Sequence, residues 1–115
     1  MAVQTTLLTQ VDVTPGSATS TAAAATINGQ TGVITTEALT TAAAATYTMT
    51  LTNASINANS IVLVTVAKGT ATTGEPAVHF VTPAAGSAVI LIRNDAAVNA
   101  LNGTIKIGFV VFNLT

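Results

Sequence analysis

The sequence contains no cysteine and no tryptophan, and it is poor in charge, with three Lys or Arg and four Asp or Glu in 115 residues. Without cysteine, the chain cannot form a disulfide framework, a thiolate nucleophile or a cysteine-ligated metal site. About a quarter of the residues in an average soluble domain are charged, whereas the share here is 6%. Because phosphate neutralisation needs clustered Lys and Arg, we expect no nucleic-acid partner.

Long hydrophobic runs are also missing. The longest, at residues 61–64 and 108–112, fall far short of the roughly 18 apolar residues that span a bilayer, so we expect no membrane partner. Disorder combines low hydropathy with high charge, but the mean hydropathy here is +0.66. The composition therefore predicts a folded domain with an unusually neutral surface.

A neutral surface has two explanations. Soluble monomers normally carry a dense pattern of charges of both signs, so a surface without one is best explained if other subunits cover much of it. The alternative is that the many Thr and Asn side chains hydrate the surface sufficiently. The first explanation is favoured, and it predicts an assembling protein.

Alternating hydrophobicity predicts an all-β fold. Residues 46–52 place Tyr47, Met49 and Leu51 on one face and threonines on the other, as a half-buried strand requires. Residues 60–66 are almost continuously apolar, which favours a strand covered on both faces. Further strands are expected at residues 7–13, 32–39, 77–82, 88–92 and 104–113. With Gly and Pro turns between them, these strands predict a single antiparallel β-sandwich, jelly-roll-like, of about eight strands.

The predicted core consists of the apolar residues that share the inward faces of these strands. They are Ile34, Tyr47, Met49, Leu51, Val62, Val64, Val78, Phe80, Ile90, Ile92, Ile105, Ile107 and Phe109.

The sandwich domain is expected at residues 17–115, after the break at Pro15-Gly16. Residues 1–16 then form either an N-terminal arm or the first strand of the same sandwich. An extended arm can add a strand to the edge of a neighbour's sheet, where main-chain hydrogen bonds supply affinity without charge. The candidate partner-binding residues are the apolar ones of this segment, Leu7, Leu8, Val11 and Val13.

Two tetra-alanine tracts, at residues 22–25 and 42–45, recur twenty residues apart. Four alanines are too few to nucleate a helix, and the flanking threonines are β-branched. We therefore expect edges or loops of small residues where another chain packs closely. Plain compositional bias is the alternative, with about equal weight.

No catalytic, cofactor or metal site is predicted. His79 is the only histidine and lies inside an expected strand. As a general base it would need a nearby nucleophile or an orienting carboxylate. Glu37, Glu75 and Asp95 stay open as that carboxylate, but a strand histidine facing solvent or an interface is much more common. One histidine and scattered carboxylates do not make a zinc or calcium site. We expect no enzymatic activity.

Residues 50–64 read Thr-Leu-Thr-Asn-Ala-Ser-Ile-Asn-Ala-Asn-Ser-Ile-Val-Leu-Val. This segment resembles one found in small β-sandwich structural proteins of tailed bacteriophages, in which a Thr-Leu-Thr-Asn strand end precedes an Ala-Asn-Ser turn and an aliphatic strand. Pieces of the same pattern follow in order at residues 74–76, 81–87, 93–94 and 100–104. The resemblance covers about residues 32–112.

The resemblance implies a homotrimeric β-sandwich or jelly-roll protein of a phage virion. One role is a capsid decoration (cement) protein that binds the major capsid protein on the outer capsid surface, after synthesis in the host bacterial cytoplasm. The other role is a fibre or knob module that binds a host-surface receptor. Receptor sites for sugars usually expose aromatic rings in loops, whereas Tyr47, Phe80, Phe109 and Phe112 all fall in expected strands. Decoration is therefore favoured.

Overall fold

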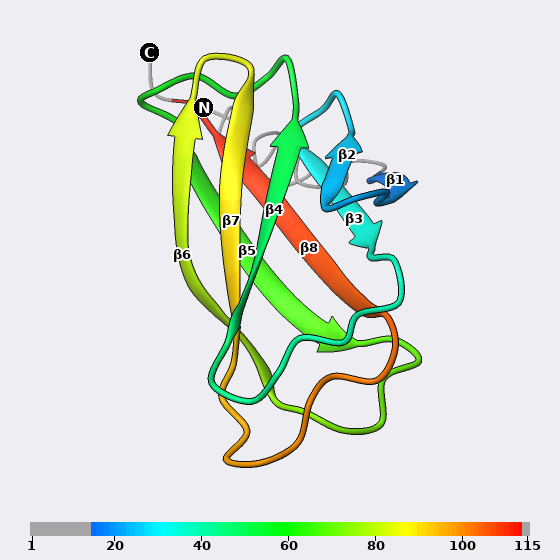
Figure 1. Ribbon diagram of the computed structural model, residues 1–115. Coiled ribbons are helices and arrows are strands. Elements are labelled where there is room, and N and C mark those ends of the chain that lie inside the picture. Colours follow the sequence, from blue (N-terminus) through cyan, green and yellow to red (C-terminus); the bar gives the residue numbers. More distant parts are fainter. Residues whose placement is uncertain (1–14, 114–115) are drawn as a thin grey trace, which may run out of the picture.

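A computed structural model describes residues 15–113. Over this range the protein is all-β, with eight strands in two four-stranded sheets (Figure 1). No helix occurs among these residues, so none there could cross a membrane. The strand expected at residues 7–13, with Leu7, Leu8, Val11 and Val13, lies outside the described residues.

Each sheet draws on both halves of the chain. The first sheet consists, in spatial order, of β1 (Gly16–Thr19), β3 (Thr31–Thr35), β8 (Ile105–Phe112) and β5 (Ile61–Lys68). The second sheet consists of β2 (Ala24–Thr26), β4 (Thr46–Thr52), β7 (Ser87–Asn94) and β6 (Pro76–Ala84). The strand expected at residues 46–52 has the bounds of β4, and those expected between residues 60 and 113 overlap β5 to β8.

Strand direction corrects one expectation. The pairs β3–β8, β5–β8, β4–β7 and β6–β7 are antiparallel, but β1 pairs with β3, and β2 with β4, in parallel. The prediction of a purely antiparallel fold is therefore wrong at the N-terminal strands. The reason is the path of the chain, which alternates between the sheets. After β1 the chain crosses to the second sheet for β2, returns to the first sheet for β3, and crosses again to the second sheet for β4. Two successive reversals bring the chain back in its original direction.

The two sheets enclose one hydrophobic cluster, which gives a sandwich-like arrangement. Ile34 and Ile107 of the first sheet and Met49, Leu51 and Ile90 of the second are completely buried. Of the predicted core, nine residues are buried and Val62, Val64 and Val78 are partly buried against the cluster. Burying such a side chain contributes roughly 1.5–3 kcal/mol. This cluster is therefore the main source of stability.

Phe80 is the one predicted core residue that lies outside, with 49% of its surface exposed. The pairing of β6 with β7 shifts between Val78 and Phe80, so that His79 is an extra residue in the strand. Such a bulge reverses the alternation of side chains beyond it. Val81 consequently packs against the core in place of Phe80.

The alanine tracts form turns and the short edge strand β2. Ala22, Ala23 and Ala44 have φ angles of 50°, 62° and 62°, a left-handed conformation that ends regular structure and costs roughly 1–2 kcal/mol per non-glycine residue. The prediction that these tracts form loops or edges is confirmed. Close packing by another chain at these positions stays a prediction.

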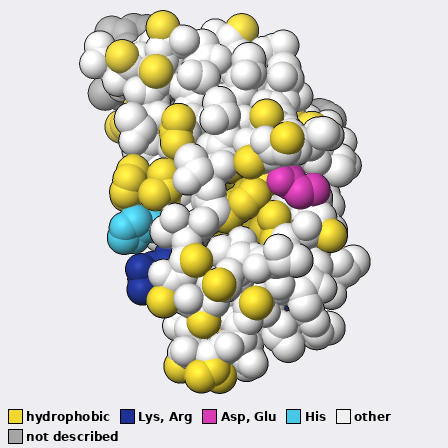
Figure 2. All heavy atoms as spheres, viewed as in Figure 1, with side chains coloured by type: hydrophobic (Ala, Val, Ile, Leu, Met, Phe, Trp, Pro, Cys, Tyr) yellow, Lys and Arg dark blue, Asp and Glu magenta, His cyan; other side chains and the backbone are white. Residues whose placement is uncertain are grey.

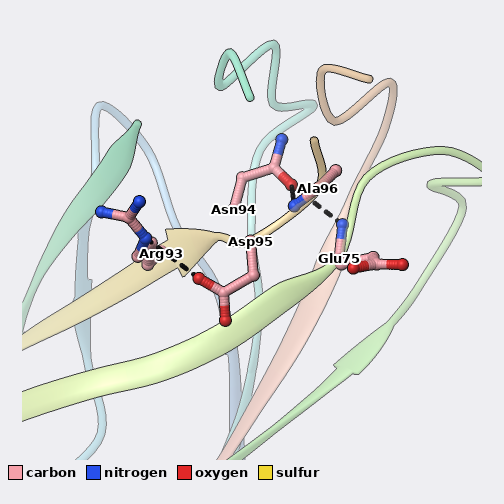
Figure 3. A network of polar contacts seen from close by, with 5 residues as sticks. All are labelled: Glu75, Arg93, Asn94, Asp95 and Ala96. Atoms are coloured by element: carbon pink, nitrogen blue, oxygen red, sulfur yellow. Dashed lines mark hydrogen bonds and ion pairs between the residues drawn. The ribbon is translucent and has the colours of Figure 1, made fainter. Parts of the chain in front are cut away.

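The side chain of Asn94 connects three loops to the end of the second sheet through hydrogen bonds. Asn94, completely buried at the end of β7, donates hydrogen bonds to the carbonyl oxygens of Thr41 (3.1 Å) and Asn99 (2.9 Å). Its Oδ1 accepts from the backbone N–H groups of Glu75 (2.9 Å) and Ala96 (3.1 Å) (Figure 3). All its hydrogen-bonding groups are thereby satisfied, as burial requires.

Candidate interaction surface

Part of the outer face of the first sheet is apolar, although Thr31, Thr65 and Lys106 also lie on this face. Ile107, Phe109 and Val111 of β8 point into the core, so the residues between them point outward. The ladder places Gly108 between Val33 and Thr65, Val110 beside Leu63, and Phe112 beside Ile61. We call the set Val33, Ile61, Leu63, Gly108, Val110 and Phe112 the apolar face.

The apolar face is accessible to solvent. The exposed fraction is 38% for Val33, 47% for Ile61, 55% for Leu63 and 50% for Phe112. This corrects the expectation that residues 60–66 are covered on both faces: Val62, Val64 and Val66 pack against the core, while Ile61 and Leu63 do not. Within residues 15–113 the fold has two layers, and no third layer covers the outside of this sheet.

A hollow lies within the apolar face because Gly108 has no side chain. Its volume is about 400 Å³, and its walls include Pro15, Val33, Leu63 and Val110. A Cβ atom on Gly108 would lie 3.2 Å from Thr65 Oγ1, so even alanine would narrow it. The walls present almost no polar atoms. The hollow therefore suits an apolar side chain better than a polar ligand, which needs convergent polar groups.

The apolar face contributes useful but limited binding energy. Complete burial of Val33, Ile61, Leu63 and Phe112, each already about half buried, adds on the order of 3–6 kcal/mol. Association of two free molecules costs an estimated 4–15 kcal/mol. A single such contact is consequently weak, and stable binding through this face needs several contacts at once.

The outer face of the second sheet is different. Thr46, Thr48, Thr50 and Thr52 of β4 all lie exposed on it. Figure 2, which shows the molecule from this side, is mostly white, the colour of the backbone and of uncharged polar side chains, with separated hydrophobic patches and few charged groups. Phe80 is the one large hydrophobic side chain of this face that is about half exposed.

A polar cluster joins the β1–β2 connection to β4. Glu37 Oε1 accepts hydrogen bonds from the hydroxyl groups of Ser20 and of Tyr47 (3.0 Å), and its Oε2 accepts from the backbone N–H of Ala23 (2.9 Å). Burial raises the pKa of Glu37, but these hydrogen bonds together outweigh it and lower the pKa below its usual value. Burial, with the nearby Glu37 carboxylate, raises the pKa of Tyr47 to about 12. Every member is already engaged within the cluster, which indicates a structural connection.

A second cleft, of about 380 Å³, lies at the end of the molecule near Lys68, Glu75 and Val98. The backbone N–H groups of Glu75 and Thr73 on its wall already donate to the side chains of Asn94 and Asn102. The only ion pair recorded among residues 15–113, between Arg93 and Asp95 at 3.0 Å, is exposed (Figure 3). An exposed pair of this kind contributes about 0–1 kcal/mol.

His79, the one histidine, is exposed, and its ring centroid lies 5.2 Å from that of Phe80. In the described part of the chain it has no hydrogen bond to a carboxylate, and no three His, Asp or Glu residues gather where they could hold a metal ion. Within residues 15–113, His79 is not part of an assembled set of nucleophile, base and orienting acid.

Sequence reasoning missed the apolar face. The signal was present in residues 61–66, whose side chains are apolar in both phases of the alternation. In a two-layer fold such a strand has one core face and one exposed apolar face. No protein-family model, curated protein or solved structure matches this chain.

Proposed function

We propose that this protein is a structural subunit of a bacteriophage virion, a decoration (cement) protein that binds the shell of major capsid protein as a homotrimer and stabilises the head. The observation that carries the proposal is the apolar face, exposed on a protein with a charged share of only 6%. Exposed apolar patches mark interaction sites. The phage context rests on the sequence resemblance over residues 32–112.

The energetics favour a repetitive lattice as the partner. Burial of one apolar face yields on the order of 3–6 kcal/mol, which does no more than offset the lower end of the cost of association. A trimer that engages several sites converts the second and third contacts into intramolecular events, and its affinity rises accordingly. A capsid offers many equivalent sites. Because few charges are available, binding depends only weakly on salt.

The predicted jelly-roll topology belongs to the same proposal. Eight strands in two four-stranded sheets agree with it. The parallel pairs β1–β3 and β2–β4 depart from it, since a jelly roll is built from antiparallel Greek keys.

A fibre or knob module that binds a host receptor is the second candidate. Phe80 favours it, because an exposed ring beside His79 offers a platform on which a sugar could stack. Against it, the loops of the described range expose no aromatic ring.

Stoichiometry separates the two roles. In purified particles of the phage that encodes this chain, decoration predicts a copy number comparable with that of the major capsid protein, and a fibre predicts a few copies per particle. Quantitative mass spectrometry measures this ratio. A low, fibre-like ratio would overturn the decoration role.

Titration onto undecorated capsids tests the surface itself. Leu63→Asp places a charge in the apolar face and should abolish attachment, whereas the matched variant Thr48→Asp, in the exposed face of β4, should leave it intact. Equal loss in both variants, or equal retention, would contradict binding through the apolar face.

A further inference from the structure

We propose that the carboxylate of Glu37 is an acid-sensitive clasp. In its ionised form it holds the connection between β1 and β2 in place, and its protonation releases these two strands while the rest of the sandwich stays folded. The connection, residues 20–23, carries the chain from the first sheet to the second. This inference goes beyond the proposed function and does not depend on it, because it concerns a conformational change within one subunit.

The connection contains a turn that its own residues do not favour. Thr21 and Ala24 exchange two backbone hydrogen bonds, of 2.9 Å and 3.1 Å, so Ala22 and Ala23 are the central residues of a two-residue turn. Their φ angles of 50° and 62° are both positive, as in a type I′ turn, which strongly prefers Asn-Gly. Alanine adopts a positive φ only at a steric cost. The turn therefore needs support from outside residues 21–24.

Glu37 supplies this support from the connection between β3 and β4. Its Oε2 accepts a hydrogen bond from the backbone N–H of Ala23 (2.9 Å), and its Oε1 accepts from the hydroxyl groups of Ser20 and of Tyr47 (3.0 Å). The backbone N–H of Glu37 donates in return to Ser20 Oγ (3.1 Å). One carboxylate thus joins the strained turn both to β4 and to the β3–β4 connection.

Protonation of the carboxylate weakens these contacts together. Hydrogen bonds to an ionised acceptor are roughly twice as strong as those between neutral groups, and a protonated carboxyl group has less acceptor capacity for its three donors. The steric cost at Ala22 and Ala23 does not change with pH. Acid therefore removes the support and leaves the strain.

Few other contacts hold β1 and β2. β1 has four residues and β2 has three, and each pairs with one strand only. The side chains that they pack against the core are small, those of Ala18 and Ala25, whereas β4 buries Met49 and Leu51. Segments with few buried apolar contacts open locally before the whole domain unfolds. Figure 1 shows both strands (blue) at one edge of the sandwich, so their release uncovers the edges of β3 and β4 and leaves the central strands in place.

Glu37 is the group of this cluster that titrates in acid. Tyr47, on β4, has its pKa raised to about 12 and stays protonated. The strands β1, β2 and β3 and residues 20–23 contain no acidic or basic side chain. Within residues 15–113, Lys106 of β8 and Arg93 of β7 form no ion pair with Glu37. Burial raises the pKa of Glu37, but the hydrogen bonds outweigh it, so we expect release below the usual value of 4.5.

Amide hydrogen exchange, followed by NMR from neutral pH to about pH 2, tests the clasp. The readouts are the backbone amides of Ser20, Ala24 and Thr50, which donate hydrogen bonds within or across the released region. The amide of Asn94, which donates to Ala45 at the end of β7, is the internal control. Protection factors, corrected for the intrinsic effect of pH on exchange, should fall at least about tenfold at the readout amides and stay within about twofold at the control.

Variants at both parts of the clasp distinguish it from general acid denaturation. Glu37→Gln removes the charge and keeps the shape, so the readout amides should be poorly protected already at neutral pH and should lose little more in acid. Ala22→Asn/Ala23→Gly supplies the residues that a type I′ turn prefers, so the connection should stay protected in acid. Glu75→Gln alters an exposed carboxylate elsewhere and is the matched control, which should open in acid like the unmodified protein.

Each contrary result overturns a stated part of the inference. Readout amides that stay protected in acid would exclude the release itself, and an equal fall at Asn94 would mean that acid unfolds the whole domain. An acid-dependent fall that persists in Glu37→Gln would assign the titration to another group. Opening of Ala22→Asn/Ala23→Gly as readily as the unmodified protein would show that strain in the turn does not drive release. None of these readouts involves a partner, so the proposed function is tested separately.

Discussion

The outer faces of the two sheets differ most along two strands, β5 of the first sheet and β4 of the second. On the first sheet, β5 exposes Ile61 and Leu63; on the second, β4 exposes Thr46, Thr48, Thr50 and Thr52. Each sheet covers the same core with its inner face. Core packing therefore does not account for the difference, because the contrasting residues of both strands point away from the core. Under the proposed function, the apolar side chains of β5 serve a contact with the capsid shell.

Two glycines on neighbouring strands of the first sheet, β3 and β8, show the same contrast between the inner and outer faces. Gly32 of β3 and Gly108 of β8 both lack side chains, but Gly32 faces inward against the Phe109 ring and Gly108 faces outward. The first glycine admits a core aromatic ring. The second leaves a hollow at the surface. The same substitution should therefore destabilise the fold at position 32 and leave its stability nearly unchanged at position 108.

The largest expected effect is that of Gly32→Val on stability. A Cβ atom at position 32 would lie 2.7 Å and 2.8 Å from carbons of the Phe109 ring, and overpacking of this kind costs about 1–3 kcal/mol. Gly108→Val should change the free energy of unfolding by no more than about 0.5 kcal/mol, as is usual at a surface position. Urea denaturation of both variants measures the difference. Equal destabilisation would show that the hollow is part of the core packing.

The second-largest effect is expected on the affinity of the protein for undecorated capsids. The double variant Ile61→Thr/Leu63→Thr gives β5 the chemistry of β4 and removes roughly 1–2 kcal/mol of binding energy per site. Affinity for undecorated capsids should fall at least about tenfold, while the midpoint of urea unfolding should change little. Loss of folding in this variant would contradict the view that these side chains serve an external contact.

Much of the fold was predictable from the sequence because alternation is a local signal. Thr46 to Thr52 alternate strictly, and β4 has the predicted bounds with Tyr47, Met49 and Leu51 buried. The parallel pairing of β1 with β3 and of β2 with β4 was not predictable in this way. It depends on which sheet each strand enters, and local periodicity does not encode that choice.

Phe80 and the apolar face show a second limit of prediction from sequence, which concerns the side chains that lie at the surface. A bulge at His79 moves Phe80 to the surface, and one inserted residue in a ladder leaves no clear mark in the sequence. For Ile61 and Leu63 the pattern itself was visible. What could not be read from it was whether a third layer covers the strand, because that depends on the arrangement of the whole fold and on partners.

The reverse exchange sharpens the comparison further. Thr48→Val/Thr50→Val makes the outer face of β4 more apolar without creating a hollow there. If shape and position decide binding, capsid affinity should stay within about twofold of the unmodified protein, a difference below 0.5 kcal/mol. Isothermal titration calorimetry at matched protein concentration measures the capsid affinity of both proteins. A gain similar in size to the loss from Ile61→Thr/Leu63→Thr would show that general hydropathy, and not the apolar face, drives attachment.

The smallest effect is expected from the pH dependence of the polar cluster around Glu37, which lies apart from the apolar face. The pKa of Glu37 is lowered in the folded protein from its usual value of 4.5. Its carboxylate therefore contributes stability that is fully present above about pH 4.5 and is lost as the pH falls through the lower, folded-state pKa. Tyr47 behaves in the opposite sense. Its pKa is raised from 10.0 to about 12, so its contribution is present below pH 10 and is lost as the pH rises toward 12.

Urea midpoints measured across pH test both contributions. Glu37→Gln should flatten the acid limb of the stability profile, and Tyr47→Phe should flatten the alkaline limb. Glu75→Gln, which alters an exposed carboxylate near the second cleft, is the matched control for the acid limb. Because only a few hydrogen bonds at a partly exposed site are involved, the change should be small beside that of Gly32→Val, and capsid attachment at neutral pH should stay the same. An acid limb that responds equally to Glu75→Gln and Glu37→Gln would contradict the assignment to this cluster.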